Sequence, residues 1–530
     1  MKHNTSHSTG ALPAVPASGS PPRGGAWLYL ATLAVSLGLT ACANMSGIAP
    51  HAQLREGASL GLPSAATGTP DVMADFAVPT EWWRSFGDAQ LDRLVGQALS
   101  TSPNLRLAEA RIARAQAVTE TARAADGPQL NGSLDVTRQQ YSANGPYPPP
   151  LAGGTFNSGV GRLSGSWEID FFGRNRAALE AALGTTQAAQ ADAQAARLLL
   201  ASNVTRNYFQ LSRLQAQLAV SERTLAQRTE TLTLVRDRVS AGLDTRLEQR
   251  QSEGGLPDAR REIESLREQI ALTRNAIGAL VGAPGSAQAL VAPAMETVPA
   301  APVPAVLPAD LLGRRPDIAA ARWRVEAAGQ DIKVAKTMFY PNVNLAGFVG
   351  LSSIGLDRFA ESGSKEWGFG PAIRLPIFDS GRLRANLRGK TADLDAAVES
   401  YNASLIDAVH DVADQVSSSR AIVRQQDEQR QAQEAAEGAY AIAVQRYKAG
   451  LGNYLNVLTA ESTVLLQRRQ AVELSARRLD TQVSLIRALG GGYTAPEIGA
   501  PASPAPVAAG GADAAAARVA AAQTDAPPPR

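Results

Sequence analysis

The stretch Arg238-Val-Ser-Ala241-Gly242-Leu243 returns 208 positions later (446 − 238) as Arg446-Tyr-Lys-Ala449-Gly450-Leu451. The same spacing separates Gly173-Arg174 from Gly381-Arg382. Repeats of about 20–50 residues build solenoids, so a much longer period indicates two fused half-units instead. The chain is therefore a tandem duplication, and its fold must be built from two similar units.

Nearer the start of each unit the spacing is slightly larger. Pro103 and Pro128 match Pro316 and Pro341 at an offset of 213 (316 − 103). One loop of the first unit must then be five residues longer (213 − 208). The Pro/Gly-rich stretch Gly145–Gly154 is the expected place, and its composition predicts an exposed hairpin loop.

The composition excludes several classes of protein. The 530 residues include 51 Lys and Arg against 49 Asp and Glu, so the basic excess of a nucleic-acid binder is missing. With one Cys and four His, an intramolecular disulfide and a Cys-based metal cage are impossible. Hydrophobic residues reach 45% but aromatic residues only 5%, which favours closely packed, Ala-rich helices.

The N-terminal segment has the sequence pattern of an export signal. An apolar run of about 14 residues, Ala26–Leu39, is shorter than the roughly 20 that a membrane-spanning helix needs. It leads into Leu39-Thr40-Ala41-Cys42, which resembles a bacterial lipobox. We expect cleavage before Cys42 and acylation of this residue, with several chains giving a stable anchor. Among lipoproteins, an Asp directly after the acylated Cys resembles a signal for retention in the inner membrane. Ala43 stands at this position instead, which indicates the outer membrane. An ordinary secretory signal with an unmodified Cys42 is the alternative.

Alternation of apolar and polar residues predicts two strands in each unit. The first unit has them at Leu130–Tyr141 and Val160–Ile169, and the second at about 342–352 and 366–375. Each strand has about 10 residues, the length that a tilted membrane strand needs. A very long helix without proline follows each pair, at about 175–235 and 383–447. About 60 residues make a rod near 90 Å, and each rod ends at Ala-Gly before a second helix returns.

Four strands cannot close a barrel by themselves. In a bilayer, unpaired backbone groups at a sheet edge cost several kcal/mol each, and the smallest membrane barrels have about eight strands. If these strands enter a membrane, the chain must therefore oligomerise. The alternative is a pair of soluble hairpins packed on the helices.

Six motifs, in order, resemble the TolC/OprM-type outer-membrane efflux proteins in their lipoprotein, NodT-like branch. They span about Val78 to Tyr493 and comprise Trp82-Trp83, Trp167-Glu-Ile-Asp170-Phe-Phe-Gly173-Arg174, Leu312-Gly-Arg314-Arg315-Pro316-Asp317-Ile318, Pro376-Ile377-Phe378-Asp379-Ser-Gly381-Arg382, Arg446-Tyr447-Lys-Ala-Gly450 and Ala488-Leu489-Gly490-Gly491-Gly492. The resemblance implies a TolC-like fold, mainly α with a membrane β-barrel, in which a homotrimer forms a 12-stranded barrel and a 12-helix periplasmic tunnel. It also implies two protein partners, a periplasmic membrane-fusion adaptor and an inner-membrane transporter of the resistance-nodulation-division (RND) type, besides outer-membrane lipid.

Several motif residues have structural explanations. Pro316 suits the first turn of a helix, where Asp317 favours the positive end of the helix dipole. Gly381 follows a strand and lets the chain turn into the rod, and Gly242 and Gly450 suit helix ends.

No candidate for catalysis survives. Gly389-Lys390-Thr391 ends like a phosphate-binding loop, but Arg384 occupies the position of its first glycine. Asp407, His410, Asp411 and Asp414 share a helix face, a pattern more typical of surface charge than of a metal site. Arg314-Arg315 is interpreted as helix-surface pairing rather than an anion site. We expect no enzyme, no metal and no cofactor beyond the covalent lipid on Cys42.

A candidate gate follows the turn at Gly450. Related channels look similar here and close the tunnel with rings of Leu and Asp. Leu455 matches the Leu, whereas Thr459 stands at the Asp position. Three hydroxyls attract cations far less than three carboxylates. Glu461 lies two residues on, about 200° around the helix from Thr459. The alternative is that Leu455 and Thr459 are ordinary packing residues at i, i+4.

The predicted organisation is a signal peptide at 1–41, an N-terminal linker at 42–85, repeats at 86–300 and 301–495, and a disordered Ala/Pro-rich tail at 496–530. An Ala/Pro linker at 283–308 joins the repeats. The predicted function is the exit duct of a tripartite RND-type pump, anchored in the outer membrane and extending into the periplasm. The alternatives are a duct for type I protein secretion, or a lipid-anchored periplasmic coiled-coil protein with a structural or adaptor role.

Overall fold

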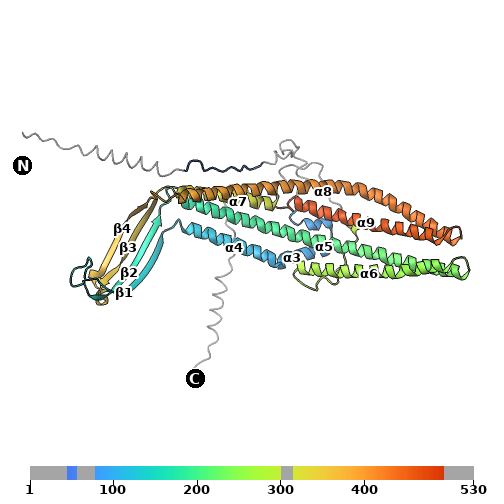
Figure 1. The fold of residues 1–530 in the computed structure, drawn as a ribbon, viewed down its shortest axis with the longest axis horizontal. Helices are drawn as coiled ribbons and strands as arrows, with labels where there is room; N and C mark the ends of the chain where they lie inside the picture. Colours follow the sequence, from blue (N-terminus) through green and yellow to red (C-terminus); the bar gives the residue numbers. More distant parts are fainter. Residues whose placement is uncertain (1–44, 56–77, 300–313, 495–530) are drawn as a thin grey trace, which may run out of the picture.

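The computed structural model describes residues 45–55, 78–299 and 314–494. The predicted signal peptide, Cys42 and the C-terminal tail lie outside these residues. The described chain is a long bundle of helices with a four-stranded sheet at one end (Figure 1).

The helices repeat in length from one unit to the other. In the first unit they are α3 Ala89–Thr101, α4 Pro103–Ala124, α5 Arg174–Ser240 and α6 Arg246–Leu280; in the second they are α7 Pro316–Thr337, α8 Arg382–Lys448 and α9 Tyr454–Ala488. The rods α5 and α8 have 67 residues each, or about 100 Å. Their partners α6 and α9 have 35 each, and α4 and α7 have 22 each. The predicted duplication and rods are confirmed.

The punctuating residues lie where the sequence predicted them. Pro103 and Pro316 are the first residues of α4 and α7. Gly381 precedes α8 with φ of 86°, a left-handed conformation that glycine adopts without strain. Asp379 accepts hydrogen bonds from the backbone amides of Gly381 and Leu383 at 3.0 and 2.8 Å. Asp379 belongs to one of the six sequence motifs, but its role as a cap was not predicted; its carboxylate stabilises the start of the rod.

Both units contribute strands to one antiparallel sheet. The strands are β1 Gln129–Gln140, β2 Thr155–Glu168, β3 Asn342–Ile354 and β4 Lys365–Arg374, in the order β1-β2-β3-β4. β2 of the first unit pairs with β3 of the second, with Trp167 opposite Leu345. β1 and β4 are thus the edge strands, and each pairs with a single neighbour among the described residues.

The two faces of the sheet differ in chemistry. One face carries exposed apolar side chains, including Leu134, Leu163, Val349, Trp367, Phe369 and Ile373. On the other face Arg162 forms an ion pair with Glu366 at 2.6 Å and covers the Phe348 ring at 4.3 Å from its centroid. The predicted alternation is therefore present in the folded sheet.

The largest core lies near the middle of the bundle, where α3 and the 3-10 helix η3 (Trp82–Phe86) pack against α5. Phe86 meets Phe209 edge to face at 5.0 Å between ring centroids. The linker predicted at 283–308 is not a free spacer over its described part, 283–299. Its Met295 is almost fully buried, and Arg478 donates hydrogen bonds to the carbonyls of Met295 and Val298. Apolar residues spaced along this segment are the physical reason, since they fill the core between α5 and α9.

Residues 45–55 lie along α8. The Asp395 carboxylate accepts hydrogen bonds from the amides of His51 and Ala52, both at 2.9 Å, and Asn402 bonds the backbone of Arg55 and Gln53. Among the described residues, no helix combines the length and the apolar content required to cross a membrane.

Candidate functional site

The loops α5–α6 and α8–α9 lie together at the end of the bundle that is far from the sheet (Figure 1). The second residue of each loop is a glycine in the left-handed conformation, Gly242 at φ 72° and Gly450 at φ 73°. Thr245 and Asn453 then cap the returning helices through hydrogen bonds from backbone amides. The glycines predicted to end the rods therefore do so.

A cluster of three polar side chains, here called the tip cluster, joins the α5–α6 loop and the last turn of α5 to the last turn of α8. Asp244 forms an ion pair with Arg238 at 2.8 Å and accepts a hydrogen bond from the Tyr447 hydroxyl. Arg238 also donates to the Tyr447 carbonyl at 3.0 Å and lies over its ring. The Arg238 and Asp244 side chains are only 12% and 10% exposed. The tip cluster thus ties the first unit to the second.

Contacts within the tip cluster shift the pKa values of two of its side chains. Burial alone would raise the pKa of the Asp244 carboxyl, but hydrogen bonds from Arg238 and Tyr447 outweigh it and hold the pKa below its ordinary value. Burial and the hydrogen bond to Asp244 raise the pKa of the Tyr447 phenol. Asp244 therefore stays charged and Tyr447 stays protonated near neutral pH.

The predicted gate residues lie near the start of α9. Leu455 is 60% exposed on the single chain, and Thr459 is exposed one turn later. The Thr459 hydroxyl donates to the Leu455 carbonyl at 2.9 Å, so its polar group is partly satisfied within the helix. Both side chains are available to meet other copies of the chain, and their gating role stays a prediction.

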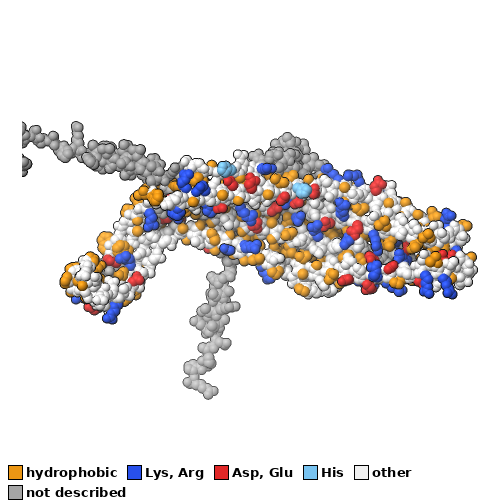
Figure 2. Space-filling model, viewed as in Figure 1, with side chains coloured by type: hydrophobic (Ala, Val, Ile, Leu, Met, Phe, Trp, Pro, Cys, Tyr) orange, Lys and Arg blue, Asp and Glu red, His pale blue; other side chains and the backbone are white. Residues whose placement is uncertain are grey.

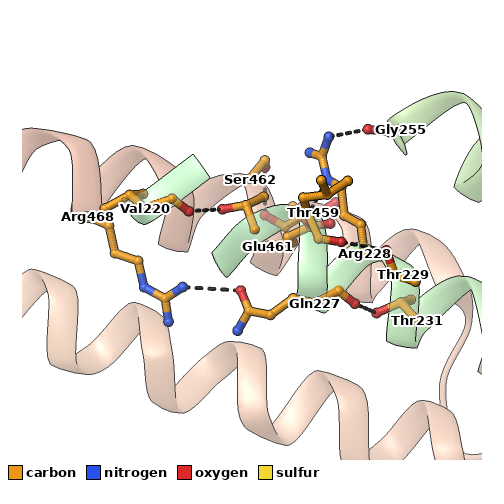
Figure 3. A network of polar contacts seen from close by, with 12 residues as sticks. Val220, Gln227, Arg228, Thr229, Thr231, Gly255, Thr459, Glu461, Ser462 and Arg468 are labelled. Carbon is orange, nitrogen blue, oxygen red and sulfur yellow. Dashed lines mark hydrogen bonds and ion pairs between the residues drawn. The ribbon is translucent and has the colours of Figure 1, made fainter. Parts of the chain in front are cut away.

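Glu461 lies on the opposite side of α9, as the helix geometry predicted. It is 8% exposed and forms an ion pair with Arg228 of α5 at 2.7 Å (Figure 3). This carboxylate is committed to a contact inside the bundle. Glu461 therefore does not supply the ring of carboxylates that is missing because position 459 is Thr instead of Asp.

The other candidates have structural partners. Arg315 forms ion pairs with Asp317 at 2.7 Å and with Asp411 at 3.5 Å, which confirms helix-surface pairing for this arginine. Burial alone would raise the pKa of the Asp317 carboxyl, but the hydrogen bond from Arg315, the charge of this arginine and backbone hydrogen bonds together outweigh burial and lower the pKa. Lys390 pairs with Asp331 at 2.9 Å. Within the described residues, no group of three or more His, Cys, Asp and Glu is placed to hold a metal ion.

Comparison with known proteins agrees with this architecture. The family model described as "Outer membrane efflux protein" matches residues 94–283 and 307–491, which is most of both units. The chain belongs to this family. The predicted resemblance and the TolC-like fold class are therefore confirmed.

The relatives are resistance proteins and outer-membrane channels. The fusaric acid resistance protein FusA of Burkholderia cepacia is 40% identical over 369 residues, 69% of each chain. The multidrug resistance outer membrane protein MdtQ of Escherichia coli is 31% identical over 459 residues, 85% of this chain and 96% of MdtQ. The solved structure of the outer membrane protein VceC of Vibrio cholerae is 36% identical, with a TM-score of 0.74, covering 78% of this chain and 99% of VceC.

These similarities establish the function at the level of the family. The protein is an outer-membrane efflux channel, the duct of an efflux pump, and its relatives are channels rather than enzymes. Type I protein secretion and a purely structural periplasmic role are not favoured by the resistance proteins that it resembles.

Proposed function

We propose that three copies of this chain form a passive duct that carries small toxic molecules from an inner-membrane RND transporter, through a periplasmic adaptor, to the cell exterior. The observation that carries this proposal is the sheet, whose two edge strands are left open by the chain itself. Inside a bilayer such edges must be paired. Each copy contributes four strands, so three copies form a closed 12-stranded barrel in which β4 of one copy pairs with β1 of the next.

The surface of the sheet fits this arrangement. Hydrophobic side chains are exposed over the sheet at one end of the molecule (Figure 2). Trp167 and Trp367 belong to the apolar face, which is the face that lipid would cover. The opposite face, with Arg162 and Glu366, is then the wall of the lumen. A barrel of eight strands is filled by its own side chains, whereas a wider one holds water, so three copies suit a conduit better than two.

The cargo is proposed from the relatives. FusA is named for resistance to fusaric acid and MdtQ for resistance to several drugs, which supports small organic toxicants as substrates. A wide duct contacts its cargo weakly, so the transporter is expected to select it.

The anchor and the gate complete the proposal. Lipid on Cys42 would tether the mature N-terminus to the outer membrane, and residues 45–55, which follow shortly after, are held along α8 by Asp395 and Asn402. Leu455 would form an apolar constriction at the periplasmic mouth.

Deleting the gene and measuring growth in the presence of fusaric acid and a panel of unrelated antibiotics tests this function. Sensitivity to at least one compound, restored by the wild-type chain, is the expected result. A strain that keeps its resistance but fails to secrete a protein would favour type I secretion instead.

A further inference from the structure

The strands repeat their register from one unit to the next. Gln129 faces Ser166 in the β1–β2 pair, and Asn342 faces Arg374 in the β3–β4 pair. The members of the second pair follow those of the first by 213 (342 − 129) and 208 (374 − 166) residues, the two offsets that relate the units in the sequence. The duplication therefore holds for individual strand pairs. We expect the pairing between units, β2 with β3, to recur where β4 of one copy meets β1 of the next.

This repetition sets the register at the contact between copies, here called the strand seam. Gly161 faces Leu351 in the β2–β3 pair. Their counterparts are Phe369 (161 + 208) and Arg138 (351 − 213), so Phe369 of one copy should face Arg138 of the next. Both residues belong to the apolar face of the sheet, where Arg138 follows Leu134 at an even spacing. A slip of one residue would put them on opposite faces, so the register keeps the apolar face continuous across the strand seam.

On both edge strands, the row of exposed apolar side chains ends in a basic residue toward the loops. The rows are Phe369, Trp367 and Lys365 on β4, and Leu134, Val136 and Arg138 on β1. Lys365 and Arg138 are exposed, and neither forms an ion pair with another residue that the structure describes. The loops β1–β2 and β3–β4 lie at the end of the sheet away from the helices (Figure 1). In the proposed duct the helices extend into the periplasm, so this end of the sheet lies in the outer leaflet.

The strand seam brings the two charges near each other. Lys365 is four residues from Phe369 on β4, which Arg138 of the next copy faces, so the two Cα atoms should be about 14 Å apart. Both side chains are long, and Trp367 lies between them on the same face. Charges on the lipid face are tolerated near the border of the apolar band, where long side chains reach the head groups. Two cations beside an indole ring thus suit an anionic head group with acyl chains below it.

We propose that each strand seam binds a phosphorylated glycolipid of the outer leaflet, lipopolysaccharide, through Lys365 of one copy and Arg138 of the next. This inference rests on the proposed trimer. The planar guanidinium of Arg138 matches phosphate oxygens, Lys365 adds a second positive charge, and the acyl chains cover Trp367 and the apolar row below it. A single chain holds only half of this site at either edge. Lipid bound there therefore also holds neighbouring copies together.

The test adds short-chain lipopolysaccharide to the full-length trimer in detergent and counts bound lipids by native mass spectrometry. The wild type should bind three, one at each strand seam. R138Q and K365Q should each weaken binding about fivefold, the change expected from one cationic group at a charged lipid surface, and the double variant about 25-fold. The control is R374Q, which removes a charge from the opposite face and the opposite end of β4 and should bind like the wild type.

The lipid arms separate the possible ligands. Lipopolysaccharide without its phosphates should bind the wild type as weakly as the intact lipid binds the double variant. Phosphatidylglycerol that binds as tightly, with the same dependence on Arg138 and Lys365, would overturn the assignment to the glycolipid. A trimeric double variant that binds lipopolysaccharide like the wild type would overturn the site and leave the two charges as residues that control edge pairing. A wild type that is monomeric with and without lipid would overturn the proposed duct instead.

The register has a test that needs no lipid. Leu134 and Ile373 of neighbouring copies should face each other, as Gly347 and Gly165 do in the β2–β3 pair. Facing Cα atoms are about 5 Å apart, within reach of a disulfide. Oxidised L134C/I373C should therefore link the copies of the trimer, whereas the control V136C/I373C, shifted by two residues, should link them far less. The reverse order in an intact trimer would overturn the register and the meeting of Lys365 with Arg138.

Discussion

Asp244 is the residue on which the tip cluster depends, because it is the shared acceptor for Arg238 and Tyr447. Tyr447 is 203 residues away from Asp244 along the chain, and no local pattern links the two residues. Gly242 and Gly450 were predictable from the sequence as helix ends, because glycine at a helix end is a short-range signal. Asp244 could not be predicted in this way, because its role arises only when the α5–α6 loop meets Tyr447 at the end of α8.

The tip cluster should weaken in acid. The folded-state pKa of Asp244 is below its ordinary value of 3.8, so the cluster contributes fully above that value and loses its contribution as the pH falls through the folded-state pKa. Conductance of the wild type should therefore stay constant between about pH 5 and 8 and rise below about pH 4. Asp244→Ala should show the raised conductance at neutral pH, because a buried arginine and phenol lose their partner, at a cost of about 1–3 kcal/mol. The prediction would be contradicted if the conductance of the wild type did not change with pH and equalled that of Asp244→Ala.

The gate makes a separate prediction for single residues. Leu455→Ala should increase single-channel conductance in planar bilayers, because the apolar ring loses bulk. Thr459→Asp should increase the preference for cations, since three carboxylates would then surround the pore. Reversal potentials in a salt gradient measure the second effect. Unchanged conductance in Leu455→Ala would place the constriction elsewhere.

At the scale of elements, most of the fold was predictable because its signals are local. Strand alternation placed β1 to β4 to within a few residues, and proline and glycine placed the ends of the helices. The burial of residues 283–299 was not predictable in the same way. An Ala/Pro-rich composition resembles a spacer, and only the three-dimensional core shows that Met295 has a place to pack.

The junction between sheet and rod offers a test at this scale. Gly381 has φ of 86°, and a Cβ there meets no atom within 4 Å, so only backbone strain opposes an alanine. Gly381→Ala should destabilise the protein by about 1–2 kcal/mol. Gly438, inside α8 and equally open, is the matched control, and Gly438→Ala should stabilise the helix by about 1 kcal/mol. Thermal unfolding in detergent compares the two, and equal shifts would refute the role given to Gly381.

At the scale of the whole molecule, a single chain leaves three kinds of surface open: two sheet edges, an apolar sheet face, and the exposed start of α9. The proposed trimer would cover all of them, with edges paired between copies, the apolar face in lipid, and the α9 segments around a common axis. No monomeric arrangement of the described residues satisfies the edges in a bilayer. The barrel, rather than the lipid, should then be the main attachment to the membrane.

Cys42→Ser separates these two attachments. The variant should lose its lipid, as mass spectrometry of the mature N-terminus would show, because serine offers no thiol for acylation. It should still reach the outer membrane as a trimer and restore drug resistance in the deletion strain, since the barrel buries far more apolar surface than the acyl chains do. Native mass spectrometry of detergent-extracted protein gives the copy number, and outer-membrane fractionation gives the location. A lipid-free variant that is released as a monomer would show that the anchor, and not strand pairing between copies, holds the protein in the membrane.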